Sequence, residues 1–220
     1  MSWLNKLERK YGKYAIKNLI MYIVGLNAFV FLLGAISPSG AYSVEQKLAL
    51  IPSLIMQGEV WRIITFIFIP FSNSPIWMIF ALYFYYLIGT TLERQWGSFK
   101  FNIYYLLGIL GTIIAGFITN GATNEYLNLS LFLAFAYLFP NFEVRLYFIL
   151  PLKIKYLAYF TWALFGFDLL TASFSNKLAI IAAVVNFFIF FGKDIYKDFR
   201  IKGKVRANRK RFRNQSNRFR

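Results

Sequence analysis

The sequence contains no cysteine and no histidine among its 220 residues. The lack of cysteine excludes disulfide bridges, thiolate nucleophiles and cysteine-based metal sites. The lack of histidine removes the side chain that most often binds zinc or haem and acts as a general base near neutral pH. We therefore expect no metal and no cofactor. Any chemistry would have to use carboxylates, lysine, arginine, hydroxyls or the backbone.

Charged residues are also scarce, at 15% of the chain against roughly 25% in soluble domains. Hydrophobic residues make up 58% and aromatic residues 21%, so there is too little polar surface to cover a water-soluble globule. The lipid bilayer is therefore the expected solvent. The nine carboxylates belong to Glu8, Glu45, Glu59, Glu93, Glu125, Glu143, Asp168, Asp194 and Asp198.

Six apolar runs indicate an all-α membrane protein with six transmembrane helices. A spanning helix needs about 20 residues, and several of these runs are shorter, so tilted packing or local thinning of the bilayer is expected. The first run exceeds a signal-peptide core and no cleavage site follows it, which indicates a retained anchor. The helices are expected at about 18–36, 75–89, 101–119, 126–139, 156–171 and 177–192.

The chain divides into a basic N-terminal segment at 1–17, a membrane domain at 18–192 and a polybasic tail at 193–220. The N-terminal segment places apolar residues at helical spacing, which suits an interfacial helix or a solvated lead-in to the first span. The first connection, 41–74, is apolar, but its runs are too short to span, so interfacial or dipping helices are expected. We also expect an interfacial segment at 142–155.

The positive charges predict the orientation, because cytoplasmic loops carry an excess of Lys and Arg. With six spans, 22 of the 25 Lys and Arg lie on the side that holds both termini. The other three are Lys47, Arg62 and Lys177. The sequence therefore predicts that both termini are cytoplasmic.

The tail at 193–220 carries 12 Lys and Arg in 28 residues. A block of like charge is usually disordered and solvated, so a disordered tail is expected. Near a membrane it would also attract anionic lipid, at about 1 kcal/mol per basic residue. Contact with nucleic acid or a ribosome is the less favoured alternative, since only charge supports it.

Polar residues within the predicted spans are candidates for function, because burial in lipid is costly for them. Asp168 lies near the outer end of the fifth helix, where it is either functional or an ion-pair partner of Arg62 or Lys177. Asn186 lies in the middle of the sixth helix and could hydrogen-bond to a neighbouring helix. The spans contain Asn27, Asn128, Ser130, Asp168 and Asn186, and we take Ser130, Asp168 and Asn186 as a candidate intramembrane polar site.

Four ordered motifs resemble the rhomboid family of intramembrane serine proteases. Residues 58–68 read GEVWRIITFIF, and residues 92–101 read LERQWGSFKF. Residues 134–141 read AFAYLFPN, and residues 151–158 read PLKIKYLA. The resemblance covers roughly residues 15–195. It implies a rhomboid-like six-helix bundle, which agrees with the topology expected from charge.

The resemblance also assigns roles to two motifs. Trp61 and Arg62 occupy the family's first-connection motif, which implies contact with clients or with the lipid interface. Glu93, Arg94 and Gly97 occupy its structural turn between the second and third helices.

The positions that carry catalysis in the family differ in this sequence. Family proteases use a serine on the fourth helix and a histidine on the sixth, because a hydroxyl needs a base to attack a carbonyl. Here the serine position falls near Glu125, and the similar string at 121–124 lies about one turn too early. The sixth helix has no histidine and no glycine pair. Other family positions are occupied by Pro70, Ser74 and Met78.

The sequence therefore favours a pseudoprotease, resembling Derlins, that binds transmembrane segments of client proteins and perturbs the local bilayer. This interpretation leans against an enzyme. An atypical protease stays open, with Ser130 or Thr123 as nucleophile and Lys177 as base. A small transporter or channel that uses Asp168 and Asn186 also stays open. The amino-acid usage suggests a bacterial inner membrane.

Overall fold

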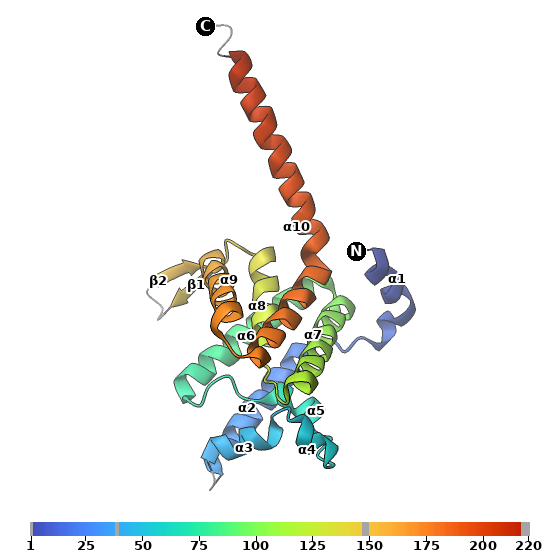
Figure 1. Ribbon diagram of the computed structural model, residues 1–220, viewed down its shortest axis with the longest axis vertical. Helices are drawn as coiled ribbons and strands as arrows, with labels where there is room; N and C mark the ends of the chain where they lie inside the picture. The colour runs from blue at the N-terminus through green and yellow to red at the C-terminus, as the bar shows by residue number, and fades with distance from the viewer. Residues whose placement is uncertain (1, 38–39, 147–149, 217–220) are drawn as a thin grey trace.

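The computed structural model describes residues 2–37, 40–146 and 150–216, which are mostly helical (Figure 1). Two 3₁₀ turns, η1 (Gly12–Tyr14) and η2 (Phe66–Phe68), accompany the α-helices. The helices are α1 (Ser2–Tyr11), α2 (Leu19–Ile36), α3 (Gly40–Leu48), α4 (Pro52–Met56), α5 (Arg62–Thr65), α6 (Pro75–Trp96), α7 (Ser98–Thr119), α8 (Glu125–Leu138), α9 (Ile154–Thr171) and α10 (Phe174–Ser216).

Four of the helices in the described residues are long and apolar enough to cross a membrane: α2, α6, α7 and the Phe174–Lys197 part of α10. Helix α8 is apolar but has only 14 residues. These helices, together with α9, coincide with the six apolar runs of the sequence. A helix satisfies its own backbone hydrogen bonds, which is what apolar segments require in lipid.

Small residues allow the helices to pack closely. A side chain at Gly89 of α6 would overlap Ile20 of α2, and one at Gly108 of α7 would overlap Leu127 of α8. A β-carbon at Gly111 of α7 would lie 3.4 Å from the β-carbon of Ala182 on α10, which is ordinary van der Waals contact. Small residues at helix contacts are typical of membrane bundles, where close backbone approach replaces the hydrophobic driving force.

The first connection folds into the bundle at the end opposite the two chain termini (Figure 1). It forms α3, α4, α5 and η2, so the expected short helices are present. The carbonyl of Ile67 accepts hydrogen bonds from the buried amides of Asn27 (3.3 Å) and Asn124 (3.1 Å). These two side chains fix η2 between α2 and the start of α8, and they satisfy backbone that would otherwise be unpaired.

The second and third long helices are separated by a single residue. The sequence predicted helices at 75–89 and 101–119 with a turn between them, but α6 continues to Trp96 and α7 begins at Ser98. Gly97 lies between them at φ 83°, a backbone conformation that favours glycine.

The all-α prediction omitted a hairpin between α8 and α9. Strands β1 (Glu143–Leu146) and β2 (Leu150–Lys153) pair antiparallel, with Glu143 opposite Lys153. The hairpin lies within the segment expected at the interface, and its extended pairing gives the backbone of this connection its hydrogen bonds. The N–H of Ile154 donates to the carbonyl of Phe142 (2.9 Å), which joins the hairpin to the start of α9.

The prediction of a disordered tail is also wrong over the described residues, because α10 continues without interruption to Ser216. Helix α10 projects far beyond the rest of the molecule (Figure 1). Nucleation of a helix is costly but its extension is not, and this stretch contains no proline. Residues 217–220 of the predicted tail lie outside the described residues. The N-terminal helix expected within 1–17 is present as α1.

Candidate functional site

A buried polar cluster joins α7, α8 and α10. Ser130 of α8 is completely buried, and its Oγ lies 2.7 Å from the hydroxyl oxygen of Tyr104 on α7. The Ser130 hydroxyl is also placed to donate to the backbone carbonyl of Ala183 on α10, at 3.1 Å. The Tyr104 hydroxyl is 2.9 Å from the carbonyl of Ser130. The cluster therefore satisfies two hydroxyl groups without exposing either to solvent.

Asn186 belongs to the same cluster. Its Nδ2 donates to the backbone carbonyl of Tyr104 at 3.3 Å, across the contact between α10 and α7. The missing side chain of Gly108 leaves room for it, since a β-carbon there would lie 3.2 Å from this nitrogen. Ser130 and Asn186 therefore both contact Tyr104, Ser130 at the phenol hydroxyl and Asn186 at the backbone carbonyl.

Asp168 lies apart from this pair. It is half-buried near the end of α9, and no hydrogen bond or ion pair joins it to Ser130 or Asn186 within the described chain. The expected ion pair with Arg62 is wrong, because the guanidinium of Arg62 pairs with Glu59 instead. The three predicted residues do not form one site.

The cluster lacks the arrangement that nucleophilic catalysis requires. A serine nucleophile needs a base within hydrogen-bond reach, whereas the partners of the Ser130 hydroxyl are a phenol and a carbonyl. Lys177, the base of the atypical protease hypothesis, is placed to donate to the carbonyl of Leu170 at 3.4 Å. It precedes Ala183 by six residues, about 9 Å along the helix axis. Thr123, the other candidate nucleophile, lines a separate cavity of about 280 Å³.

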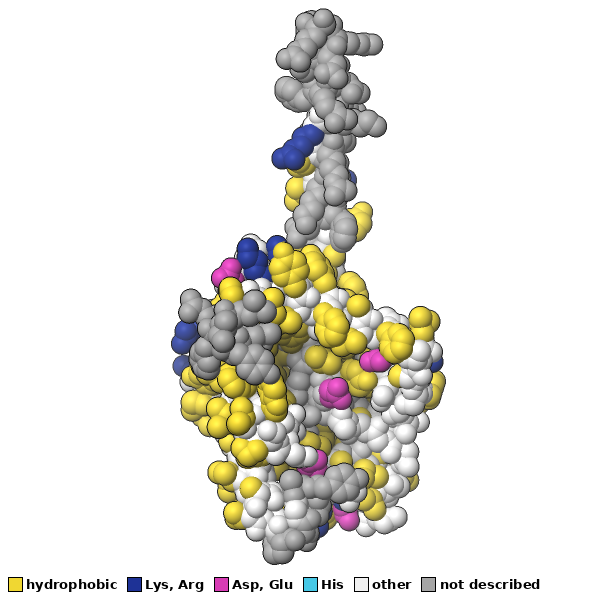
Figure 2. Space-filling model, turned by 90° about the vertical axis from the view of Figure 1, so that its left-hand side faces the viewer, with side chains coloured by type: hydrophobic (Ala, Val, Ile, Leu, Met, Phe, Trp, Pro, Cys, Tyr) yellow, Lys and Arg dark blue, Asp and Glu magenta, His cyan; other side chains and the backbone are white. Residues whose placement is uncertain are grey.

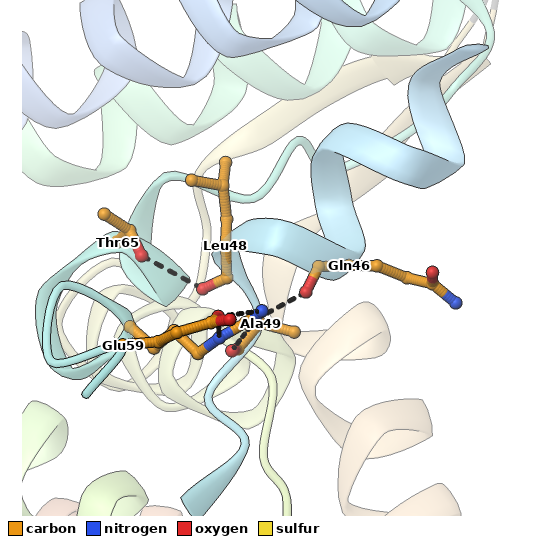
Figure 3. Close-up of polar contacts among 6 residues, drawn as sticks. Gln46, Leu48, Ala49, Glu59 and Thr65 are labelled. Atoms are coloured by element: carbon orange, nitrogen blue, oxygen red, sulfur yellow. Dashed lines mark hydrogen bonds and ion pairs between the residues drawn. The ribbon is translucent and has the colours of Figure 1, made fainter. Parts of the chain in front are cut away.

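The Trp61–Arg62 motif divides into a buried and an exposed part. Arg62 is only 4% exposed, and its guanidinium donates to the carbonyls of Gln46 (2.5 Å) and Ala49 (3.0 Å) at the end of α3 (Figure 3). Its Nε and second terminal nitrogen each lie 2.6 Å from Glu59 Oε2. Trp61 is 52% exposed.

These contacts give Arg62 a structural role. The last carbonyls of an α-helix have no partner within the helix and carry a partial negative charge. Arg62 supplies donors and a positive charge there, and Thr65 adds a hydrogen bond to the carbonyl of Leu48 at 3.1 Å (Figure 3). The motif thus ties α5 to α3 and leaves Trp61 exposed.

The predicted turn motif centres on Glu93, which is 8% exposed. Its Oε1 accepts the backbone N–H of Asn18 (2.8 Å) and the hydroxyl of Ser98 (2.6 Å). Asn18 precedes α2 and Ser98 begins α7, so one carboxylate stabilises the positive N-terminal ends of two helices. Arg94 is exposed, and Gly97 forms the junction between α6 and α7.

Several residues that build these clusters were missed at the level of sequence. Tyr104 is one of 15 tyrosines and has no distinguishing neighbours. Glu59 could have been found, because its three-residue spacing to Arg62 suits an ion pair on one helical turn. Ser98 could have been found as a polar residue at a helix start. The other residues missed were Asn18 and Asn124.

The apolar helices, their small-residue contacts and the buried polar clusters between them define an integral membrane protein. The chain belongs to the family described as eukaryotic integral membrane protein (DUF1751), whose family model matches residues 17–192. No curated protein matches the chain. The matched region coincides closely with the predicted membrane domain at 18–192. Since the family is described as eukaryotic, the expectation of a bacterial membrane finds no support.

Proposed function

We propose that this protein is a rhomboid-like, non-proteolytic membrane protein that binds transmembrane segments of client proteins along the side formed by α6 and α9. The observation that carries the proposal is the combination of a rhomboid-like motif order with a buried Ser130 whose hydroxyl meets only Tyr104 and a carbonyl. The motif order supports the scaffold, and the one serine of α8, which is buried, makes a packing contact without a base beside it.

Helix α8 packs against both α6 and α9. Phe132 of α8 packs against Phe84 of α6, with ring centroids 6.1 Å apart. Tyr126 of α8 packs against Phe165 of α9, also at 6.1 Å. Since α8 contacts each of these helices through its own aromatic ring, α6 and α9 can flank a client helix that lies over α8.

Large aromatic side chains are exposed on both flanking helices. Tyr83 on α6 and Tyr159 on α9 each have about two thirds of their surface exposed, at 65% and 66%. Figure 2 shows hydrophobic side chains gathered on the side of the molecule that faces left in Figure 1, where α9 and part of α6 lie. Aromatic residues give large contact area and are enriched at recognition surfaces.

Photo-crosslinking tests the client side directly. A photoreactive amino acid at Tyr83 or Tyr159 of the full chain, in its native membrane, should give adducts with membrane proteins. The matched control is Tyr22 of α2, which is 55% exposed on another helix. Equal protein adducts at all three positions, or adducts with lipid alone, would contradict the proposal.

We further propose six spans with both termini cytoplasmic, in which α8 and α9 cross together with the four longer helices. The charge distribution supports this orientation, as does the location of the N-terminal helix at the end of the bundle from which α10 projects (Figure 1). Helix α8 is about 21 Å long, shorter than a hydrocarbon core of about 30 Å. It would therefore thin the bilayer locally.

Because the chain has no cysteine, single cysteines can report the topology without background. A cysteine that replaces Lys13, Asn141 or Lys197 should react with a membrane-impermeant thiol reagent from the cytoplasmic side. A cysteine that replaces Ser72 or Asn120 should react from the other side. Labelling of Asn141 from the side that labels Asn120 would refute the six-span arrangement.

The protease alternative makes a separate prediction. A fluorophosphonate probe should leave the purified protein unlabelled, because the Ser130 hydroxyl has no base beside it in the cluster. Labelling that disappears in Ser130→Ala would favour the atypical protease instead. The transporter alternative requires that the protein carry an ion or solute into proteoliposomes and that Asp168→Asn reduce this flux.

A further inference from the structure

An elongated cavity of about 460 Å³ lies between the N-terminal segment and the body of the protein. Tyr11 and Tyr14 line one end, Leu19 and Ile23 of α2 line one wall, and α7 lines another. Its volume falls within the roughly 300–1,000 Å³ typical of small-ligand sites. Nearly all of its lining side chains are apolar or aromatic, so it suits a hydrocarbon ligand.

The depth of the cavity matches one leaflet of a bilayer. Along α7 its lining runs from Phe99 to Ile109, a rise of about 15 Å. Half of a hydrocarbon core of about 30 Å is the same length. On α2 only the first turns contribute, through Leu19 and Ile23, and the cavity ends against Ile67 and Phe68 of η2. Ile67 contacts Asn27 halfway along α2, so this end lies near the middle of the bundle. A spanning client helix would need the whole thickness, whereas one acyl chain of a lipid needs one leaflet.

Positive charge lies at the tyrosine end of the cavity. The ammonium of Lys10 is 5.2 Å from the ring centre of Tyr11, and that of Lys13 is 4.9 Å from the ring centre of Tyr14. Both lysines are exposed. The carboxylate of the N-terminal segment, Glu8, is paired with Lys100 at 3.2 Å. The charge available at this end is therefore positive, which favours an anionic headgroup.

One polar atom beside the cavity has no partner. The Oδ1 of Asn102, a residue that lines the cavity, is buried and accepts no hydrogen bond within the described chain. Asn102 lies one turn after Phe99, at the charged end of α7. A buried acceptor without a donor costs free energy, and a donor from a lipid headgroup at this depth would satisfy it.

We propose that this cavity binds one anionic phospholipid from the leaflet that surrounds the N-terminal segment. One acyl chain occupies the apolar cavity, and the phosphate lies between Lys10 and Lys13. Phosphatidylserine is a suitable anionic probe, because its negative charge suits the two lysines. This site lies beside α1 and α7 and does not depend on the client side at α6 and α9.

The test uses the full chain in lipid nanodiscs made of phosphatidylcholine and phosphatidylserine in a 4:1 ratio, followed by native mass spectrometry of the released protein. The wild-type protein should retain one phosphatidylserine. The double variant Lys10→Gln/Lys13→Gln should lose about tenfold or more of this retention, as expected for two basic residues near the surface. The matched control, Lys193→Gln/Lys197→Gln, removes the same charge at exposed positions of α10 and should retain the lipid.

A second pair of variants tests the cavity itself. Leu106→Trp places a larger side chain at a lining position and should reduce retention of any phospholipid. Leu110→Trp adds the same side chain to α7 at a position 45% exposed that does not line the cavity, and should have no effect. Unchanged size-exclusion profiles for both variants would exclude a folding defect.

Three outcomes would overturn the proposal. The first is equal loss of lipid in the N-terminal and α10 charge variants, since the attraction would then be unspecific. The second is full retention in Leu106→Trp. The third is a retained ligand whose mass fits a free fatty acid or a peptide instead of a phospholipid.

Discussion

The hydroxyl oxygens of Tyr104 and Ser130 lie 2.7 Å apart inside the contact between α7 and α8. Each hydroxyl also faces a backbone carbonyl, that of Ala183 for Ser130 and that of Ser130 itself for Tyr104. Two polar side chains that are costly in lipid thereby become a cross-link among three helices. The serine that might have been a nucleophile contributes to packing.

Removal of the phenol hydroxyl should weaken this cross-link. We expect Tyr104→Phe to destabilise the protein by about 1 kcal/mol, since it removes one buried hydrogen-bond partner and leaves the ring in place. Tyr159→Phe makes the same change at an exposed position and should have no effect. The midpoint of thermal unfolding in detergent, followed by tryptophan fluorescence, measures both. Equal midpoints for the two variants would contradict the structural role.

Replacement of Arg62 should loosen the first connection. Arg62→Ala leaves the carbonyls at the end of α3 and the carboxylate of Glu59 without their donor, at a cost of about 2–4 kcal/mol. Arg62→Lys keeps the positive charge but loses the several N–H donors of the guanidinium. Its stability should therefore lie between that of Arg62→Ala and that of the wild type. Lys47→Ala, an exposed change in α3, the helix whose end Arg62 contacts, is the control. The interpretation fails if Arg62→Ala and Lys47→Ala unfold at the same temperature.

Glu93 and its neighbour Arg94 provide a matched pair. We expect Glu93→Ala to destabilise the protein by about 1–3 kcal/mol, because the N–H of Asn18 and the hydroxyl of Ser98 lose a charged acceptor. Arg94 is exposed, so Arg94→Ala should change stability by no more than about 0.5 kcal/mol. The thermal unfolding midpoints of the two variants, measured under the same conditions, test this difference. A larger loss for Arg94→Ala would reverse the assigned roles.

Helical glycines provide a second matched pair. A β-carbon at Gly89 would overlap Ile20, whereas one at Gly166 of α9 meets nothing within 4 Å. Gly89→Ala should therefore destabilise the protein by about 1–3 kcal/mol through overpacking. Gly166→Ala should be neutral or stabilising by up to about 1 kcal/mol, since alanine favours a helix. If both substitutions stabilise the protein, the close contact between α2 and α6 is wrong.

The helices were predictable because their signal is local. An apolar run of sufficient length must become a helix in lipid, whatever it packs against, and the starts of α2, α6 and α8 lie within a residue of the expected positions. The hairpin at 143–153 was missed because its strands have only four residues each, and no Gly, Asn or Asp stands between them to mark a turn. The helical tail was missed because net charge alone favoured disorder.

The candidate site was only partly predictable. Ser130 and Asn186 could be chosen because polar residues within apolar runs are costly. Their partner Tyr104 could not, since nothing in its neighbourhood separates it from other tyrosines. Arg62 and Asp168 each had a plausible ion-pair partner in the sequence, yet Glu59 lies closer to Arg62 in space and occupies its guanidinium.

The sequence by itself determined that the chain is a membrane protein, that its long apolar runs are helical and which chemistries are unavailable. These follow from composition and from the cost of burying polar groups. Only the tertiary structure decided what each polar residue does. Hydrogen bonds act over about 3 Å, and the partners of Ser130, Arg62 and Glu93 include groups brought to that distance only when separate helices pack.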